Sequence, residues 1–263
     1  MTRILVTGAT GTVGTHLVRE LRSRGADFRT ARGSLAYDLD GIDRVYVCAA
    51  DGPRKVAHET ALIEAAAEAG VERIVKLSAL HADPASPLPA HRWHGEIEAA
   101  LRKSRVPSVV LRPAFFMTNL LMVAEGVART GLLHAPTAGR RVAMIDVRDV
   151  AEVAAIALLD EESAGHTYDL TGPKAITFAD VATAMADATA RPVRSVDLTE
   201  EQARPRFESA GLPGWLAMQL AGVFGLIRAG AFERVTGTVE AVTGHPARDI
   251  GEFAREHAAA FTR

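Results

Sequence analysis

The chain has 263 residues, 48% of them hydrophobic, and a formal net charge of -2 at pH 7. Its length suits one α/β domain with an appendage, and the near balance of charge argues against a surface that binds nucleic acid through bulk positive charge. The single cysteine, Cys48, excludes an internal disulfide, and no apolar run reaches transmembrane length. We therefore expect a cytoplasmic protein that binds neither nucleic acid nor membrane.

The opening residues carry a pattern typical of nucleotide-binding βαβ units. An apolar strand over residues 4–6 runs into a glycine turn, and a helix follows that ends at Gly25. Gly8 permits the sharp turn, Gly11 the close approach of a pyrophosphate, and Gly14 the packing of the helix. The helix N-terminus directs its N–H groups and its positive dipole end at the phosphates. We assign to this phosphate cradle Gly8, Thr10, Gly11, Thr12, Val13 and Gly14. A tight turn without a ligand is the alternative.

The second predicted strand, residues 27–30, ends without the acidic residue that would bind the ribose 2′-hydroxyl of NAD. Arg32 stands there instead, with Arg29 nearby, and a guanidinium can bind a 2′-phosphate through two hydrogen bonds. This favours NADP(H) as the cofactor, and a solvated surface arginine is the alternative.

The segment from residue 33 to 43 is short for the helix and strand that usually follow in a doubly wound fold. Residues 44–49 already have the composition of a buried parallel strand. A crossover between parallel strands needs about 10–12 residues. We therefore expect that one βα unit is missing and that the adenine side of the cofactor pocket is trimmed.

The remaining pattern predicts an α/β fold, a Rossmann-like doubly wound parallel sheet with a small, mainly helical C-terminal substrate lobe. The boundary is placed so that residues 1–132 bind NAD(P), with sheet contributions from about 142–170, and residues 133–263 form the lobe. Strands are expected at 73–77, 108–111, 142–145, 167–170 and 193–198, and helices at 53–69, 91–104, 150–159, 178–188 and before Gly131.

The chain resembles the NmrA-like atypical short-chain dehydrogenase/reductases, and most of all their bacterial NADPH–quinone oxidoreductase branch. The resemblance weakens between residues 32 and 43 and otherwise spans nearly the whole chain. It is carried by VTGATGTVG, CAADGP, KLSALHADPASPL, HGEIEAAL, VVLRPAFFMTN, IDVRDVAEVA, YDLTGP, GLPGWLAMQL and TGHP.

The resemblance implies NADP(H) bound over the glycine turn, with Arg32 near the 2′-phosphate and a small substrate between sheet and lobe. The cofactor would be lined by Ala49, Ala50, Ser78, Ala79 and Leu80, and the substrate would lie near Phe115, Phe116 and Asn119. His81 is added to the substrate site, because ligands bind at the carboxyl ends of strands in such sheets. For the phenylalanines, filling the lobe interface is the alternative.

The tyrosine and lysine of a classical short-chain dehydrogenase are missing. A tyrosine acid needs a lysine four residues later to lower its pKa. Four residues beyond Tyr37, Tyr46 and Tyr168 stand Gly41, Ala50 and Gly172. This argues against the standard alcohol dehydrogenase mechanism.

The predicted helix 91–104 carries His91, His94 and Glu98 on one face. We expect Glu98 to orient His94, so that this histidine protonates a substrate oxygen after hydride transfer, and Ser78 to donate a hydrogen bond to substrate or nicotinamide. An exposed His–Glu pair and a strand-end serine that caps backbone groups are the alternatives. Zinc bound by these groups with His81 lacks a supporting motif, and no metal is assigned.

The function expected is NADPH-dependent reduction of a planar quinone or conjugated carbonyl molecule, in the tailoring of a natural product, by a protein that could form a homodimer. Two alternatives stay open. One is a redox-neutral enzyme in which the cleft that holds the cofactor in other members of the family serves as the substrate pocket. The other is a regulator that senses a dinucleotide without turning it over.

Overall fold

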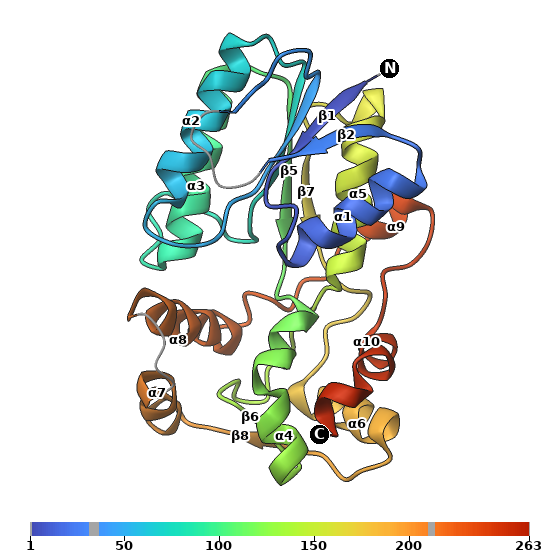
Figure 1. The fold of residues 1–263 in the computed structure, drawn as a ribbon. Helices are drawn as coiled ribbons and strands as arrows, with labels where there is room; N and C mark the ends of the chain where they lie inside the picture. The colour runs from blue at the N-terminus through green and yellow to red at the C-terminus, as the bar shows by residue number, and fades with distance from the viewer. Residues whose placement is uncertain (1, 32–36, 210–213, 263) are drawn as a thin grey trace. The chain divides into compact units, whose positions relative to one another are not determined.

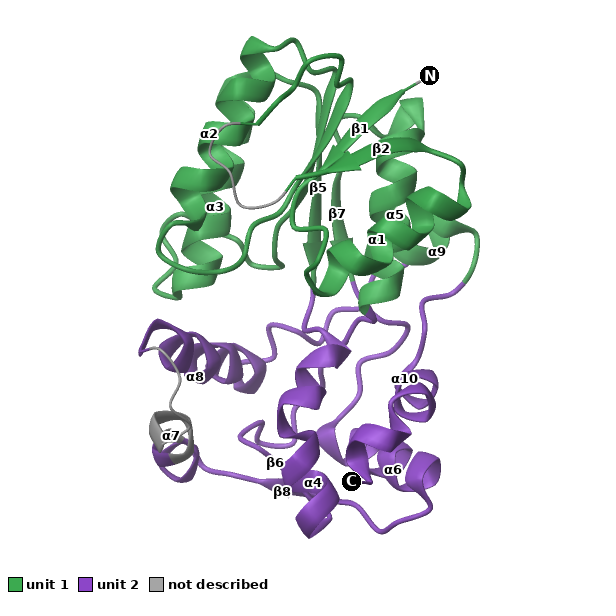
Figure 2. Ribbon diagram, viewed as in Figure 1, with its two compact units in different colours: residues 1–113, 147–170, 238–245 green, residues 114–146, 171–237, 246–263 purple. Residues whose placement is uncertain are grey.

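The computed structural model describes residues 2–31, 37–209 and 214–262, so Arg32 lies outside the described residues. The chain forms two compact units, shown in different colours in Figure 2. The first comprises residues 1–113, 147–170 and 238–245, and the second comprises residues 114–146, 171–237 and 246–263. The predicted boundary at residue 132 falls inside the second unit.

The first unit is built on a six-stranded sheet in which every pair of neighbours is parallel, in the order β2-β1-β3-β4-β5-β7. Helices α2 and α3 cover one face, and α1, α5 and α9 lie on the other (Figure 1). The strands are β1 (Arg3–Val6), β2 (Asp27–Thr30), β3 (Arg44–Val47), β4 (Arg73–Leu77), β5 (Ser108–Pro113) and β7 (Thr167–Leu170). The helices are α1 (Thr12–Ser23), α2 (Lys55–Glu68), α3 (Pro89–Ser104), α5 (Val147–Leu159), the short η2 (Glu161–Ser163) and α9 (Thr238–Thr243). The predicted Rossmann-like sheet is confirmed.

Burial of both sheet faces explains the composition of the strands. Every residue of β3 and β4 is buried, and apart from Arg44, Arg73 and Lys76 these strands consist of hydrophobic residues. Helix α1 presents Val13, Leu17 and Leu21 to the sheet at helical spacing. Because all neighbouring strands run parallel, their carboxyl ends, where ligands bind in such sheets, lie at the same edge of the sheet.

The connection between β2 and β3 is short, as the sequence predicts. Strand β3 pairs directly with β1, and the described part of the connection, residues 37–43, contains no helix or strand. Its side chains Leu39 and Ile42 are buried in one cluster with Val45 and Ile63. Two apolar side chains therefore close the core where a doubly wound fold usually has a helix.

The second unit holds a two-stranded parallel sheet of β6 (Leu132–Ala135) and β8 (Arg194–Asp197), surrounded by helices. Helix α6 (Phe178–Thr189) begins at the predicted residue, and the Thr177 hydroxyl caps it by accepting from the Asp180 N–H in a capping box. The other elements are η1 (Met117–Val123), α4 (Ala124–Thr130), α7 (Glu200–Ser209), α8 (Gly214–Arg228), α10 (Ile250–Glu256) and η3 (Ala258–Phe261).

One predicted strand is wrong and one was missed. Residues 142–145 form only isolated bridges, Val142 with Ile176 and Ile145 with Phe116, although all four are buried. Strand β6 was not predicted, because its four residues follow Gly131 without alternation of their own. Within the described ranges, the helices are all too short or too polar to cross a bilayer.

Candidate functional site

The glycine turn has the geometry that a dinucleotide cradle requires. Gly8 adopts a φ of +64°, and a Cβ there would lie 2.7 Å from the Cys48 carbonyl oxygen. A Cβ on Gly14 would lie 2.1 Å from the Gly8 carbonyl oxygen, so only glycine lets α1 pack this closely. Gly11 is the N-cap of α1 and donates its N–H to the Gly8 carbonyl oxygen over 2.9 Å.

The N-terminus of α1 is open to an anion. No side chain caps it and its first turn has no acidic residue. Thr10, Gly11 and Thr12 are exposed, whereas Val13 and Gly14 are buried. The free N–H groups and the helix dipole suit a phosphate group. The residues fit a dinucleotide, and its binding here stays a prediction.

Arg29, within β2, already has a partner. Arg29 donates from Nη1 to Asp38 Oδ2 over 2.9 Å and from Nη2 to the Asp38 carbonyl oxygen. The predicted contact of Arg32 with a 2′-phosphate lies outside the described residues.

The predicted lining of the cofactor lies at the ends of β3 and β4. Ala50 is exposed, and Ala79 and Leu80 are half-buried, so these side chains are accessible to a ligand. Ala49 is fixed through its backbone, because its N–H donates to Glu59 Oε1 over 2.8 Å and its carbonyl oxygen accepts from Lys55 Nζ over 2.7 Å.

Glu98 does not orient His94, contrary to the sequence prediction. Its Oε1 accepts from Ser78 Oγ over 2.6 Å and from Arg112 Nε over 3.0 Å, and its Oε2 pairs with Arg112 Nη2. Because a serine hydroxyl has one proton, Ser78 is committed to Glu98 and is not available as the predicted donor to substrate. Arg112 and Ser78 attract this carboxylate more strongly than the neutral ring one turn earlier on α3.

His94 instead belongs to a group that we call the buried lysine cluster, Lys55, Glu59, Lys76 and His94. Lys76 Nζ lies 3.3 Å from His94 Nδ1 and 2.8 Å from Glu59 Oε2. Lys55 Nζ lies 2.9 Å from Glu59 Oε1. All four side chains are buried. The cluster lies between β4, α2 and α3, and it contributes the contacts that fix Ala49.

Sequence reasoning missed the three charged members of this cluster. The available signal was Lys76 itself, a lysine between Val75 and Leu77 in the interior of a buried strand. Such a residue needs a buried counter-charge, and Glu59 follows Lys55 at helical spacing on α2.

The surroundings of His94 define its protonation. Burial lowers the pKa of His94 well below 6.5, and the charges of Lys76 and Lys55 lower it further, with His91. The ring is therefore neutral at pH 7. A lysine ammonium has donors only, so Nδ1 accepts from Lys76 and the ring proton is on Nε2. Nε2 lies 4.0 Å from Asp51 Oδ1.

The two other histidines of the prediction lie in different environments. His91 is buried, and burial and the nearby His81 lower its pKa to about 4. His81 is exposed and has a φ of +63° at the end of β4. Across the described ranges, no group of three or more His, Cys, Asp or Glu side chains is placed to hold a metal ion.

The predicted substrate residues on the chain after β5 lie in the second unit. Phe115 and Phe116 are half-buried, and the Phe115 ring lies 6.4 Å from the ring of Phe224 at a tilt of 54°. Asn119 closes the first turn of η1, because its N–H donates to the Phe116 carbonyl oxygen. Phe115 therefore has a packing role, and contact of these residues with a substrate stays a prediction.

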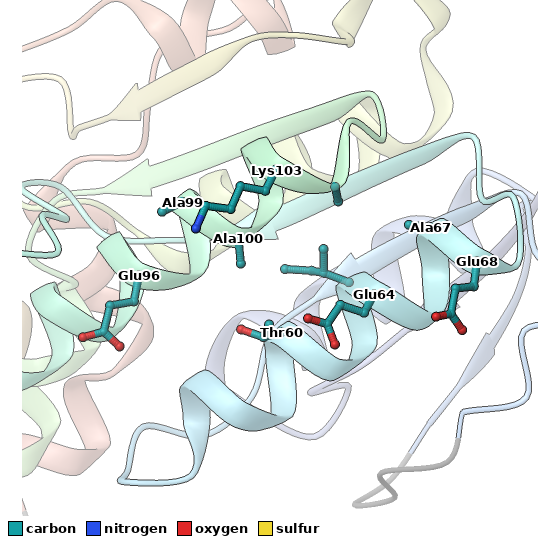
Figure 3. Close-up of a pocket in the computed structure, with 10 residues that line it drawn as sticks. Thr60, Glu64, Ala67, Glu68, Glu96, Ala99, Ala100 and Lys103 are labelled. Carbon is teal, nitrogen blue, oxygen red and sulfur yellow. The ribbon is translucent and has the colours of Figure 1, made fainter.

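A groove of about 510 Å³ lies between α2 and α3 (Figure 3). It presents charged groups from both helices, among them Glu64, Glu96 and Lys103. The residues that line it are Thr60, Ile63, Glu64, Ala67, Glu68, Glu96, Ala99, Ala100, Lys103 and Ser104. No residue predicted for the functional site is among them.

Comparison with known proteins assigns the chain to a family. The NmrA-like family matches residues 27–252. The NAD(P)H azoreductase of Xenophilus azovorans is 37% identical over 283 residues, covering 98% of this chain and 99% of that protein. The (4-alkanoyl-5-oxo-2,5-dihydrofuran-3-yl)methyl phosphate reductase of Streptomyces griseus is 34% identical, covering 98% and 99%.

Solved structures support the same fold. The NADPH-dependent quinone oxidoreductase of Escherichia coli, complexed with NADPH, has a TM-score of 0.85 at 24% identity, covering 96% of this chain and 99% of its own. The Citrobacter triphenylmethane reductase complexed with NADP(H) has a TM-score of 0.81 at 18% identity, covering 97% and 99%. With its glycine cradle, its parallel sheet and these full-length matches, the chain belongs to the NmrA-like family.

Proposed function

We propose that the chain is an NADPH-dependent reductase of a quinone or another conjugated carbonyl molecule. The observation that carries this proposal is the glycine turn, where Gly8 and Gly14 leave no room for a Cβ and α1 opens toward an anion. Relatives of at least 34% identity over nearly the whole chain are named as reductases, one of them with NAD(P)H in its name. These relatives support the assignment to the NAD(P)H-dependent oxidoreductases.

The cofactor proposed is NADP(H). The cradle residues would hold its pyrophosphate, Arg32 its 2′-phosphate, and the tips of β3 and β4 its nicotinamide half. When bound, the dinucleotide supplies a hydride to the substrate, and the chain supplies orientation and a proton. The contacts that fix Ala49 make the tip of β3 a rigid support for this purpose.

His94 is the proton donor that we propose. Its Nε2–H would protonate the oxygen that becomes negative after hydride transfer, while Lys76 holds Nδ1 as an acceptor. Glu98 and Ser78 act indirectly, because Glu98 of α3 accepts from Arg112 of β5 and from the Ser78 hydroxyl after β4, and these bonds fix α3 to the sheet. The substrate would contact His81, Phe115, Phe116 and Asn119, and the lobe would select it.

We also propose that the substrate is an intermediate of a natural product. The Streptomyces griseus relative is named as a reductase of a 4-alkanoyl-5-oxo-2,5-dihydrofuran phosphate, which is a small molecule with carbonyl groups. A tailoring step on a comparable molecule is therefore proposed for this chain. Assembly into a homodimer is a separate proposal, which the molecular mass in solution tests.

The test is to offer the purified protein a panel of quinones, azo dyes and enones with NADPH or NADH. We expect tighter binding of NADPH than of NADH in calorimetry and oxidation of NADPH with a quinone or enone. Binding without any turnover would instead indicate a sensing role. If no dinucleotide binds, the shortened connection before β3 would favour a redox-neutral enzyme.

A further inference from the structure

A buried ammonium lies directly behind the ring of His94. Lys76 Nζ is 3.3 Å from His94 Nδ1, and its other partners are Glu59 Oε2 at 2.8 Å and the Leu77 carbonyl oxygen. The Lys76 side chain has an exposed fraction of 0%. On the opposite edge of the ring, Nε2 faces Asp51, whose side chain is 46% exposed. The imidazole thus lies between a buried ammonium and a partly exposed carboxylate.

We propose that Lys76 supplies the proton that passes through His94, so that the neutral ring acts as a relay. Lys76 is a positioning residue in this scheme, since it reaches the substrate only through His94. The inference rests on the proposed function, because the relay needs a reduction that leaves a negative substrate oxygen.

The relay balances in protons and charge. The substrate oxygen forms an O–H bond as the Nε2–H bond of His94 breaks, and Nδ1 forms an N–H bond as one N–H bond of Lys76 breaks. Lys76 becomes a neutral amine, and the ring ends as the other neutral tautomer. A water proton taken up at Nε2 after product release returns the Nδ1 proton to Lys76. No further route to the buried amine is required.

The charges around the cluster favour loss of a proton from Lys76 and not from Lys55. Lys76 has Glu59 as its carboxylate partner and shares it with Lys55, whereas Lys55 also lies 3.2 Å from Asp51 Oδ1. Lys55 is therefore held as an ammonium by two carboxylates, and deprotonation of Lys76 leaves the Lys55–Glu59 pair intact. Burial lowers the pKa of Lys76, and Lys55 lowers it further, while Glu59 and Cys48 oppose them. For Lys55, the charges of Glu59, Cys48 and Asp51 outweigh burial and raise the pKa.

The test separates two roles of Lys76, which are to fix the tautomer of the His94 ring and to supply the proton. In Lys76→Arg, the guanidinium still only donates, so it keeps Nδ1 as the acceptor, but it does not release its proton in the working pH range. In Lys76→Met, both functions are lost, while Glu59 keeps Lys55. The histidine tautomer is read from ¹⁵N chemical shifts of histidine-labelled protein, and kcat is measured with saturating NADPH and a quinone between pH 6 and 10.

We expect Nε2–H tautomers of His94 in wild type and Lys76→Arg, and no fixed tautomer in Lys76→Met. Both variants should lower kcat by about 100-fold or more, the scale of general acid catalysis, with an NADPH dissociation constant within about three-fold of wild type. In wild type, kcat should fall at high pH, because Lys76 then loses the proton that the relay needs. This fall should be absent from both variants.

Lys55→Met is the matched control, because Lys55 is also buried against Glu59 but does not contact His94 in the described structure. Its removal takes away a charge that lowers the pKa of Lys76, so the alkaline fall of kcat should move to higher pH. The size of kcat is not compared, since Lys55 also fixes Ala49. If the Lys76 variants do not fold, the pH profile of kcat in Lys55→Met tests the relay by itself.

Three results would overturn the relay in a wild-type protein that turns over. The first is a Lys76→Arg variant with the kcat and pH profile of wild type. The second is an alkaline fall of kcat in Lys55→Met at the same pH as in wild type, and the third is a His94 proton on Nδ1 in wild type. Failure of the proposed function looks different, because wild type would then oxidise no NADPH with any acceptor, whatever the tautomer.

Discussion

Glu98 of α3 pairs with Arg112 of β5, and not with His94, which lies one turn earlier on the same helix. The pairing connects the middle of α3 to the strand beneath it and leaves His94 to Lys76. Two neighbouring positions of one helix face therefore serve different purposes, one in stability and one in the proposed chemistry.

Glu98→Ala should destabilise the protein without altering the protonation of His94. The change leaves Arg112 without its carboxylate and Ser78 without its acceptor, so we expect the free energy of unfolding to fall by about 2 kcal/mol or more. Urea unfolding measures this. The control is Arg102→Ala, which removes an exposed arginine 3.7 Å from Glu98 and should cost less than about 0.5 kcal/mol. An altered His94 tautomer in Glu98→Ala would contradict this assignment.

Gly14→Ala should disrupt the cradle. Its Cβ would lie 2.1 Å from the Gly8 carbonyl oxygen, so α1 must move away from the turn. We expect a loss of stability of at least about 2 kcal/mol and loss of NADPH binding, measured by thermal unfolding and calorimetry.

Gly126→Ala is the matched control for this substitution. Gly126 is also the third residue of its helix, and a Cβ there would meet nothing within 4 Å. This variant should gain about 0.5–1 kcal/mol and bind NADPH as wild type does. Equal behaviour of the two variants would show that the cradle is not closely packed.

The buried histidines should make the protein less stable below neutral pH. The pKa values of His91, about 4, and of His94 lie below their unfolded value of 6.5, so the unfolded chain binds more protons in this window. Stability therefore rises with pH, and lowering the pH from 7 to 5 should cost about 2 kcal/mol for each ring.

Urea unfolding at both pH values checks this prediction with His91→Gln and with His91→Gln/His94→Gln. The single variant should lose about half of the pH effect and the double variant nearly all of it. A pH effect of wild-type size in the double variant would assign the effect to other groups.

Arg32→Ala should weaken NADPH binding by about ten-fold and leave NADH binding unchanged, because only NADPH carries the 2′-phosphate. Arg29→Ala is the control, since this guanidinium is already paired with Asp38. Calorimetry with both dinucleotides measures the effect. A larger loss in Arg29→Ala would place the 2′-phosphate at Arg29 instead.

The sequence allowed the cradle, the parallel sheet and the missing βα unit to be predicted, because each depends on local pattern. Glycine spacing determines the turn, and the short distance from residue 33 to 43 leaves no room for another crossover. The capping of α6 by Thr177 was predictable for the same reason. The predicted strand at 142–145 failed because an apolar run of this length indicates burial but not pairing.

The partners of His94 and Glu98 were not predictable from helical spacing. Spacing shows that two residues share a helix face, but it does not show which residues of other elements lie opposite. Arg112 and Lys76 come from strands that the fold brings beneath α3. An arginine outcompetes a neutral imidazole for a carboxylate, and this competition depends on tertiary structure.

The short connection between β2 and β3 also leaves β2 as an edge strand. Among the residues that the structure describes it pairs with β1 alone, which is the arrangement that leaves a row of backbone groups available to another chain. The strand has only four residues, and Asp27 and Arg29 place charges along it. Short length and charge are the features by which natural sheets resist aggregation through their edges. The loss of a βα unit is thus compatible with resistance to edge-to-edge aggregation, provided that β2 keeps these charges.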